Sequence, residues 1–320
     1  MNRTLPLLAA LAVLLSSCEK EITVDLPETE PKLVVEGTIE VGGPPIVILT
    51  RTQSYFAPTD LNSIAAIFVK GAVVVVSDGI TTDTLDQVCS SQIPDSLIDE
   101  AAAATGLDPD LLASADICVY TDLGNQLIGV EGRTYSLYVA ADDKVCTSVT
   151  SIPHAVALDS TWFRLAQDEP DDDTLGFIWA TLSDPDTMGN AYRWYAKRIN
   201  DGSDGEDKDD SFIAPFFSVF EDRYVNGLTF DFSYNRGDDP YAEEDEDDAE
   251  NGYFKVGDTV VVRFASIGLK EYQFYNSWYN NVASQGDLFS NPANARSNVD
   301  GGLGVWAGYS YAYDTVVCQP

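Results

Sequence analysis

The residue types that most often perform chemistry in proteins are sparse in this chain, apart from carboxylates. Its 320 residues include one histidine, five cysteines and 52 acidic residues. Catalysis needs a positioned nucleophile, base or metal, and the sole imidazole, His154, follows Pro153 between two strand-like segments. We therefore predict a structural or solvent-exposed role for His154. The sequence patterns of a nucleophilic serine elbow, a zinc protease and a phosphate-binding glycine loop do not occur, so no enzyme is predicted.

One cysteine lies where a thiol has a defined chemical use. Arg3 opens a positive segment, residues 5–15 are apolar, and two serines precede Cys18, which is the pattern of a secretory signal. The apolar run of about 11 residues is too short to span a bilayer, which needs ~20. LSSC at 15–18 resembles the bacterial lipobox, in which the cysteine becomes the N-terminus and forms a thioether to a diacylglycerol. An ordinary signal with a chance cysteine at the cut is the alternative.

Lipid on Cys18 implies a membrane anchor and a location in the cell. Burial of each CH₂ contributes ~0.8 kcal/mol, so three acyl chains hold a protein far more firmly than one. The residues EKE at 19–21 resemble the export signal of Bacteroidota surface lipoproteins. We therefore predict a signal peptide at 1–17, a lipidated tether at 18–30 and an outward-facing position on the outer membrane.

The other four cysteines permit three pairings, and an exported protein can form disulfides. Cys89 and Cys118 flank a helical segment, so we predict a bridge between them that closes its base. By chain entropy a loop of this length, roughly 30 residues, stabilises by about 3–4 kcal/mol. Cys146 and Cys318 either form a second bridge, which would tie the first domain to the C-terminus, or remain free. A zinc site is not expected, because no CxxC pair exists.

Clustered carboxylates raise the question of calcium. The segment DGSDGEDKDD at 201–210 is rich in hard oxygen ligands, with Asp201, Asp204 and Asp207 as candidate ligands. The segment departs from the EF-hand pattern, and a solvated loop is the alternative interpretation. Asp184 and Asp186 form a second small cluster.

The overall charge limits the partners. With 18 basic and 52 acidic residues, the formal net charge is −34. Such a surface repels nucleic acid and anionic lipid headgroups, so neither is an expected partner. It suits cations or basic peptides, or alternatively a salty medium in which carboxylates keep the surface hydrated.

The elements that position these residues are predicted to be mainly β-strands. LVVEGTIEV and PPIVILTRT read as paired strands, and GAVVVVSDG and RTYSLYVAAD continue the pattern. Residues 93–114 interrupt it with a helical pair, because Gly106 ends one helix and Asp108-Pro109 begins the next. We predict that residues 31–155 form a β-sandwich of the immunoglobulin or fibronectin type with this helical insertion.

The second half, residues 156–320, is predicted to form a second β-sandwich domain with one helix. NAYRWYAKRIN, LTFDFSYN and YFKVGDTVVVRFASI read as strands, and LKEYQFYNSWYNNVASQ as the helix. Residues 236–251 are very acidic and indicate a loop.

Aromatic residues of the second half are candidates for contacts with a partner or ligand. The helix near 269–285 presents Tyr272, Tyr275 and Tyr279 on one face, and Phe274 and Trp278 on an adjacent one. One face must pack on the sheet, so Trp278 and Tyr279 are candidates for contact with a partner, although core packing explains both faces as well. Trp306 is a third candidate, because Gly304 and Gly308 would let a ligand approach.

Taken in order, these motifs resemble an outer-membrane lipoprotein family of Bacteroidota that is defined only as domain of unknown function 4249. The resemblance rests on the lipobox with its acidic continuation, and on PKLVVEGTIEVGGPPIVILTRTQSYF, EGRTYSLYVAADD, SIPHAVALDS, KEYQFYNSW, NP at 291–292 and SNVDGGLGVWAGYS. It implies an outer-membrane lipoprotein often encoded beside a TonB-dependent transporter barrel. It implies no catalytic activity and no cofactor.

Three functions follow as hypotheses. The first is a surface-exposed, non-catalytic binding accessory to a TonB-dependent nutrient transporter, whose partners are the barrel and an unknown nutrient. The second is a structural or adhesive cell-surface lipoprotein without a role in transport. The third is a surface hydrolase, which no motif supports.

The lipid anchor gives the first testable prediction. A Cys18→Ala variant should leave the membrane fraction, because the thiol that forms the thioether is gone. Cell fractionation with a fatty-acid label measures both association and acylation. A Cys146→Ala variant, which keeps the lipobox, is the control. Retention of the Cys18→Ala protein in the membrane would contradict a lipid anchor at this position.

Overall fold

The computed structural model describes residues 30–54, 60–167, 173–202, 205, 207–237, 250, 252–284 and 295–320. The predicted signal peptide, Cys18 and most of the tether lie outside these residues, as does nearly all of the acidic loop. Residues Pro31–Pro320 form one compact unit. No helix within the described ranges is long and apolar enough to cross a membrane.

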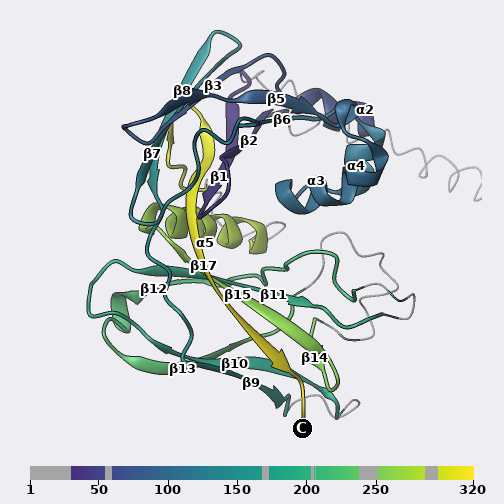
Figure 1. The fold of residues 1–320 in the computed structure, drawn as a ribbon, viewed down its shortest axis with the longest axis vertical. Coiled ribbons are helices and arrows are strands. Elements are labelled where there is room, and N and C mark those ends of the chain that lie inside the picture. The colour runs from purple at the N-terminus through teal and green to yellow at the C-terminus, as the bar shows by residue number, and fades with distance from the viewer. Residues whose placement is uncertain are drawn as a thin grey trace, which may run out of the picture. The chain divides into compact units, whose positions relative to one another are not determined.

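The described chain is mainly β, as predicted (Figure 1). The strands of the first half are β1 (Leu33–Glu40), β2 (Ile46–Arg51), β3 (Val73–Ser77), β4 (Thr82–Thr84), β5 (Asp86–Cys89), β6 (Cys118–Thr121), β7 (Thr134–Ala141) and β8 (Lys144–Ser151). Those of the second half are β9 (Ser160–Leu165), β10 (Leu175–Ser183), β11 (Ala191–Arg198), β12 (Val219–Glu221), β13 (Thr229–Tyr234), β14 (Phe254–Lys255), β15 (Thr259–Ile267), β16 (Val299–Asp300) and β17 (Leu303–Val317).

Four α-helices accompany these strands: α2 (Leu61–Ile67), α3 (Ile98–Thr105), α4 (Pro109–Ser114) and α5 (Leu269–Ala283). Short 3-10 turns cover Ser90–Gln92, Asp95–Leu97 and Asp222–Tyr224. The predicted helical insertion is confirmed. Gly106 ends α3 in the left-handed conformation, and Asp108 caps α4 by accepting the Leu111 N–H at 3.1 Å. Helix α5 is also confirmed, whereas α2 was not predicted.

One eight-stranded sheet joins the two halves of the chain, in the order β12-β11-β15-β17-β1-β2-β6-β5. The long strand β17 is the junction. Its first part, from Leu303 to Tyr309, pairs in parallel with β1, and its second part, from Ser310 to Val317, pairs antiparallel with β15. The predicted boundary at 155/156 falls between β8 and β9. Because β16 and β17 complete sheets that begin in the first half, a cut at this boundary would leave strands on both sides unpaired.

Two smaller sheets cover one face of this large sheet. The five-stranded sheet β16-β8-β7-β3-β4 encloses a core with β1, β2 and β6. The four strands β9, β10, β13 and β14 enclose a second core with β11 and β15. Trp306 lies in the first core and Val316 in the second. Since side chains alternate along a strand, these two even-numbered residues of β17 place both cores on the same face.

Helices cover the opposite face. Helix α5 packs on β11, β15 and β17 through a third apolar cluster that includes Tyr279 and Tyr309. Helices α2, α3 and α4 pack on β2 and β6 through a fourth cluster. Strand β1 lies between the strands that carry these two helical covers, and its outward side chains are Val34, Glu36, Thr38 and Glu40.

The structure shows the pairing state of the four cysteines that follow Cys18. A disulfide joins Cys89 of β5 to Cys118 of β6, beside the helical insertion, which confirms the first bridge. Of the two alternatives for Cys146 and Cys318, a second bridge or free thiols, the structure shows free thiols, both of them buried. Cys146 belongs to the first core and Cys318 to the second, so two different apolar clusters enclose them.

Trp306 is a core residue, and its prediction as a ligand contact is wrong. It is 0% exposed and its indole N–H donates to the Tyr135 carbonyl at 3.1 Å. Its strand partner is Gly37 of β1. A Cβ at Gly37 would lie 2.7 Å from the Trp306 ring, so glycine there makes room for the indole and not for a ligand.

A buried network of ion pairs stabilises the edge of the second core. Arg198, at the end of β11, donates to Asp209 at 2.6 Å and also pairs with Glu250. Lys208 bridges Glu250 at 3.1 Å and Asp258 at 3.0 Å. Burial raises the pKa of Glu250, but the ion pairs with Lys208 and Arg198 outweigh burial, so its pKa lies below the ordinary 4.5.

The position of Trp306 predicts a large loss of stability on truncation. Trp306→Ala should lower the free energy of unfolding by about 3–5 kcal/mol, because it removes a fully buried ring and leaves a cavity. Trp278→Ala, which truncates a half-exposed indole, should cost about 1 kcal/mol. Urea unfolding monitored by circular dichroism measures both. Equal costs would contradict the core position of Trp306.

The ion-pair network predicts a loss that depends on pH. At neutral pH, Arg198→Ala should lower the free energy of unfolding by about 3–5 kcal/mol, because buried carboxylates lose their main partner. The exposed pair of Arg51 with Asp142 is the control, and Arg51→Ala should cost under about 1 kcal/mol. The lowered pKa of Glu250 stabilises the fold above the ordinary carboxyl pKa, and this contribution is lost as pH falls through the folded value. The difference between wild type and Arg198→Ala should therefore shrink in urea unfolding below about pH 4; a constant difference would contradict this assignment.

Candidate functional site

Two arginines lie on the helical face of the large sheet, close to one tyrosine ring. Arg193 and Tyr195 are two positions apart on β11, so they share a face, and Tyr195 is directly opposite Arg263 of β15. The Arg193 guanidinium carbon is 4.8 Å from the centre of the Tyr195 ring, and that of Arg263 is 4.4 Å from it. The Tyr195 ring therefore contacts two cations.

Further rings hold each guanidinium. Arg193 lies 3.9 Å from the ring centre of Tyr275 on α5. Arg263 lies 4.3 Å from that of Phe212 and 4.8 Å from that of Tyr311. Cation–π attraction to several rings fixes both side chains in place. We call this group the arginine–tyrosine site; its members are Arg193, Tyr195, Phe212, Arg263, Tyr275, Tyr309 and Tyr311.

Neither cation has an anionic partner within the described part of the chain. Arg193 donates through Nη2 to the hydroxyl of Tyr279 at 3.3 Å, but its buried Nε has no acceptor. The buried Nε of Arg263 has none either. Three other arginines differ, because Arg51, Arg133 and Arg198 each form an ion pair with an aspartate.

The tyrosines of the site supply hydroxyls and not negative charge. The hydroxyls of Tyr275 and Tyr309 are 2.5 Å apart, and the Tyr311 hydroxyl donates to Glu40 at 2.6 Å. Burial raises the pKa of all three phenols above the ordinary value of 10, so they stay neutral at physiological pH. The positive charge of the two guanidinium groups is therefore left uncompensated by these rings.

Glu36 of β1 is the carboxylate whose charge Arg193 influences. Its side chain is exposed, yet surrounding protein desolvates it and raises its pKa, and the positive charge of Arg193 opposes that shift. Glu36 shares its face of β1 with Glu40, and Glu40 is the strand partner of Tyr309. Glu36 and Glu40 therefore lie on the same face of the large sheet as the arginine–tyrosine site.

An exposed group of aromatic side chains adjoins this site, and we call it the aromatic patch. It consists of Phe216, Phe217 and Trp278, whose side chains are 54%, 45% and 42% exposed. The rings of Phe216 and Trp278 stack with centres 6.2 Å apart. Phe217 has a positive φ of 59°, which a residue with a side chain seldom adopts.

Tyr279 connects the aromatic patch to the arginine–tyrosine site. Its ring centre lies 5.5 Å from Phe216 and 5.7 Å from Phe217, and its hydroxyl accepts from Arg193. Because Tyr279 is only 2% exposed, its prediction as a partner contact is wrong. Exposure leaves Trp278 available for such a contact, which stays a prediction.

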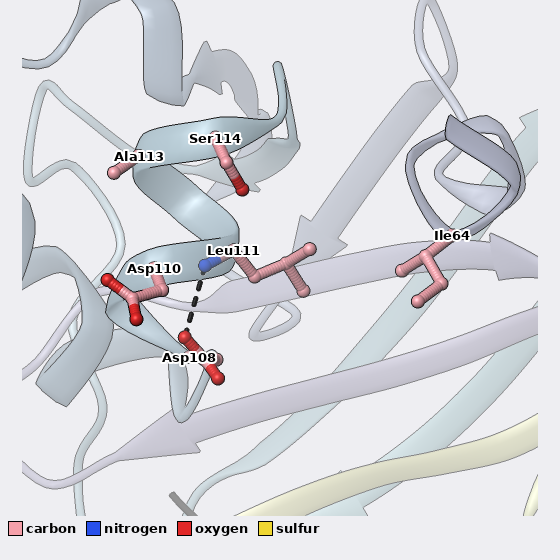
Figure 2. A pocket seen from close by; sticks show the side chains of 6 residues that line it. All are labelled: Ile64, Asp108, Asp110, Leu111, Ala113 and Ser114. Atoms are coloured by element: carbon pink, nitrogen blue, oxygen red, sulfur yellow. Dashed lines mark hydrogen bonds between the residues drawn. The ribbon is translucent and has the colours of Figure 1, made fainter. Parts of the chain in front are cut away.

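A hollow of about 590 Å³ lies elsewhere, between helices α2 and α4 (Figure 2). Ile64 lines it from α2, and Asp108, Asp110 and Leu111 line it from the start of α4. The dashed line in Figure 2 shows that Asp108 is engaged in capping, by accepting the Leu111 N–H. The lining is mostly apolar, so this hollow offers little chemistry.

Two of the predicted calcium ligands, Asp201 and Asp207, are paired across a short antiparallel bridge. Asp201 is exposed, Asp207 pairs with Lys197 at 3.1 Å, and Asp204 lies outside the described residues. In the second acidic cluster, Asp184 is buried and accepts from the hydroxyl of Tyr192 at 2.5 Å, while Asp186 is exposed. Protein donors therefore occupy Asp207 and Asp184.

The remaining candidates for metal binding or imidazole chemistry in the described ranges are a cysteine–aspartate group and His154. Cys89, Asp116 and Cys118 lie close enough to share an ion, but both sulfurs are used in the disulfide. His154 is 80% exposed and lies 3.2 Å from the Glu131 carboxylate. It contacts solvent, in agreement with its predicted role.

The arginine–tyrosine site was not predicted, although the sequence carries a signal for it. Arg193 interrupts the apolar strand AYRWYA, and Arg263 interrupts VVVRFAS. A charged residue inside a strand with apolar residues on both faces indicates a special environment. Alternation alone assigns Arg193 to the same face as Tyr195, but the pairing of β11 with β15 is needed to bring Arg263 beside them.

Comparison with known proteins identifies the family of this chain. The model of one family, described as a domain of unknown function (DUF4249), matches residues 19–314. No curated protein matches the chain. Because the match spans most of the chain, from the residue after Cys18 to β17, the protein belongs to the DUF4249 family.

Proposed function

We propose that this protein is a surface-exposed outer-membrane lipoprotein that acts as a non-catalytic binding accessory to a TonB-dependent nutrient transporter. The aromatic patch is the observation that supports this proposal best. Phe216, Phe217 and Trp278 expose large rings beside one another, and such rings are enriched at the centres of protein interfaces. The resemblance of residues 15–18 to a lipobox supports attachment to the membrane.

The backbone at the aromatic patch supports a role in contact. Phe217 adopts a left-handed conformation that costs of order 1–3 kcal/mol for a residue with a side chain. This conformation places Phe217 against Tyr279 while leaving it 45% exposed. A strained and exposed aromatic residue gives no benefit to an isolated fold, and a partner that covers the ring supplies one.

The chemistry of the adjoining site supports binding over catalysis. Its titratable tyrosines have raised pKa values, which makes them poor bases at neutral pH. Its cations are fixed among rings, as suits a group that orients a ligand. The single histidine of the chain, His154, instead lies on the surface beside Glu131.

The aromatic patch predicts the effect of a double variant on partner recovery. Phe216→Ala/Trp278→Ala should abolish co-purification of a barrel protein from detergent-solubilised membranes, because both central rings are removed. Tyr138→Ala is a matched control, since Tyr138 is an aromatic residue on β7 with a similar 40% exposure. Unfolding curves of both variants verify that the fold is kept.

The alternative role, a structural or adhesive surface protein, predicts a different result. In that case the wild-type protein is recovered without a barrel, a deletion strain takes up nutrients normally, and adhesion is lost. Equal recovery of the barrel with wild type and with the double variant would contradict the aromatic patch as the docking surface.

A further inference from the structure

We propose that Arg193 and Arg263 form a binding site for the oxyanion group of a ligand, namely a carboxylate, sulfate or phosphate. This proposal goes beyond the accessory role, because it concerns the arginine–tyrosine site alone and applies to the protein without any partner. The site opens on the helical face of the large sheet, where both arginine side chains keep partial exposure.

The first argument is the lack of anions in a chain that is rich in them. The sequence holds 52 acidic and only 18 basic residues, so an acidic partner is available for every arginine. Arg51, Arg133 and Arg198 have such partners, whereas no ion pair of Arg193 or Arg263 occurs among the described residues. No carboxylate forms an ion pair with either guanidinium among the described residues, and Glu36 acts on Arg193 only through its charge, so an incoming anion adds a short-range attraction.

The second argument is that hydrogen-bonding capacity is left unused. A guanidinium group offers five N–H donors in a planar fork that matches an oxyanion. The Nε atoms of both Arg193 and Arg263 are buried without an acceptor. The buried Nε atoms are closed to solvent, so a ligand would bind the partly exposed ends of the two guanidinium groups, where the acceptor that the protein supplies is the Tyr279 hydroxyl, 3.3 Å from Arg193.

The third argument is preorganisation. The Tyr195 ring lies 4.8 Å from one guanidinium carbon and 4.4 Å from the other, and Tyr275 contacts Arg193 while Phe212 contacts Arg263. The arginines therefore lose little conformational freedom when a ligand binds. The neutral hydroxyl of Tyr311, which is partly exposed, lies in the same cluster and suits a hydroxyl group next to an acidic group, as on an acidic sugar.

The negative charge of Glu36 should weaken anion binding at the arginine–tyrosine site. Removing that charge therefore gives a test whose expected effect is opposite to that of removing an arginine. Its exposed carboxylate lies close enough to Arg193 for their charges to interact. An anion that approaches along β1 meets this negative charge. Replacing Glu36 by a neutral residue should therefore strengthen anion binding. Replacing either arginine by a neutral residue should weaken binding of the same ligands.

The test uses lipidated protein purified in a non-ionic detergent, and measures binding by calorimetry at constant ionic strength. The probes are trigalacturonate for a carboxylate sugar, a sulfated heparin disaccharide for sulfate, and inorganic phosphate. Maltotriose is the neutral control. We expect at least one anionic probe to bind saturably and maltotriose not to bind; which probe binds identifies the source of the oxyanion.

Matched variants connect binding to the site. Arg193→Gln and Arg263→Gln should each weaken binding by about tenfold or more, the effect expected for a hydrogen bond to a charged group. Glu36→Gln should tighten it severalfold, and Lys144→Gln, on β8 away from the site, should leave it unchanged. If the arginine variants fail to fold, Glu36→Gln still decides the matter.

Two outcomes would overturn the proposal. One is the absence of saturable binding by all three anionic probes. The other is binding that is insensitive to Glu36→Gln and to whichever arginine variants fold. Neither outcome depends on recovery of a barrel protein, so failure of the oxyanion site and failure of the accessory role are distinguishable.

Discussion

The double pairing of β17 is the constraint on which the rest of the structure depends. A single strand gives its first half to β1 and its second half to β15, and so makes one sheet from two halves of the chain. Two smaller sheets then cover one face of this sheet, and helices cover the other. Trp306 of β17, packed against Gly37, holds the parallel pair of β1 and β17 at the centre of the first core.

The same pairing creates the candidate site. Tyr311 of β17 contacts Arg263, and Tyr195 of β11 contacts both Arg263 and Arg193. Glu40 of β1 then reaches the Tyr311 hydroxyl. Residues from the two ends of the chain and from its middle thus meet on the outer face of the sheet, where α5 completes the cluster with Tyr275.

Local patterns in the sequence predicted what depends on near neighbours. Alternation identified β7, the Asp108-Pro109 cap identified α4, and flanking position identified the bridge between Cys89 and Cys118. Pairings between strands that are distant in the sequence could not be predicted from local patterns. The glycines beside Trp306 suggested space for a ligand, but the backbone carbonyls of Val35 and Ser151 occupy that space, and both residues are remote in sequence. The unpaired state of Cys146 and Cys318, and the meeting of Arg193 with Arg263, likewise depend on which strands become neighbours.

The position of β17 also determines when folding can finish. The hydrogen bond between Tyr311 and Glu40 joins residues 271 positions apart, and such long-range contacts form slowly because a long loop must close first. Until β17 has been synthesised, β1 and β15 each keep an open edge, and open edges aggregate readily. The nascent protein therefore passes through a stage in which protection by other proteins matters more than its final stability.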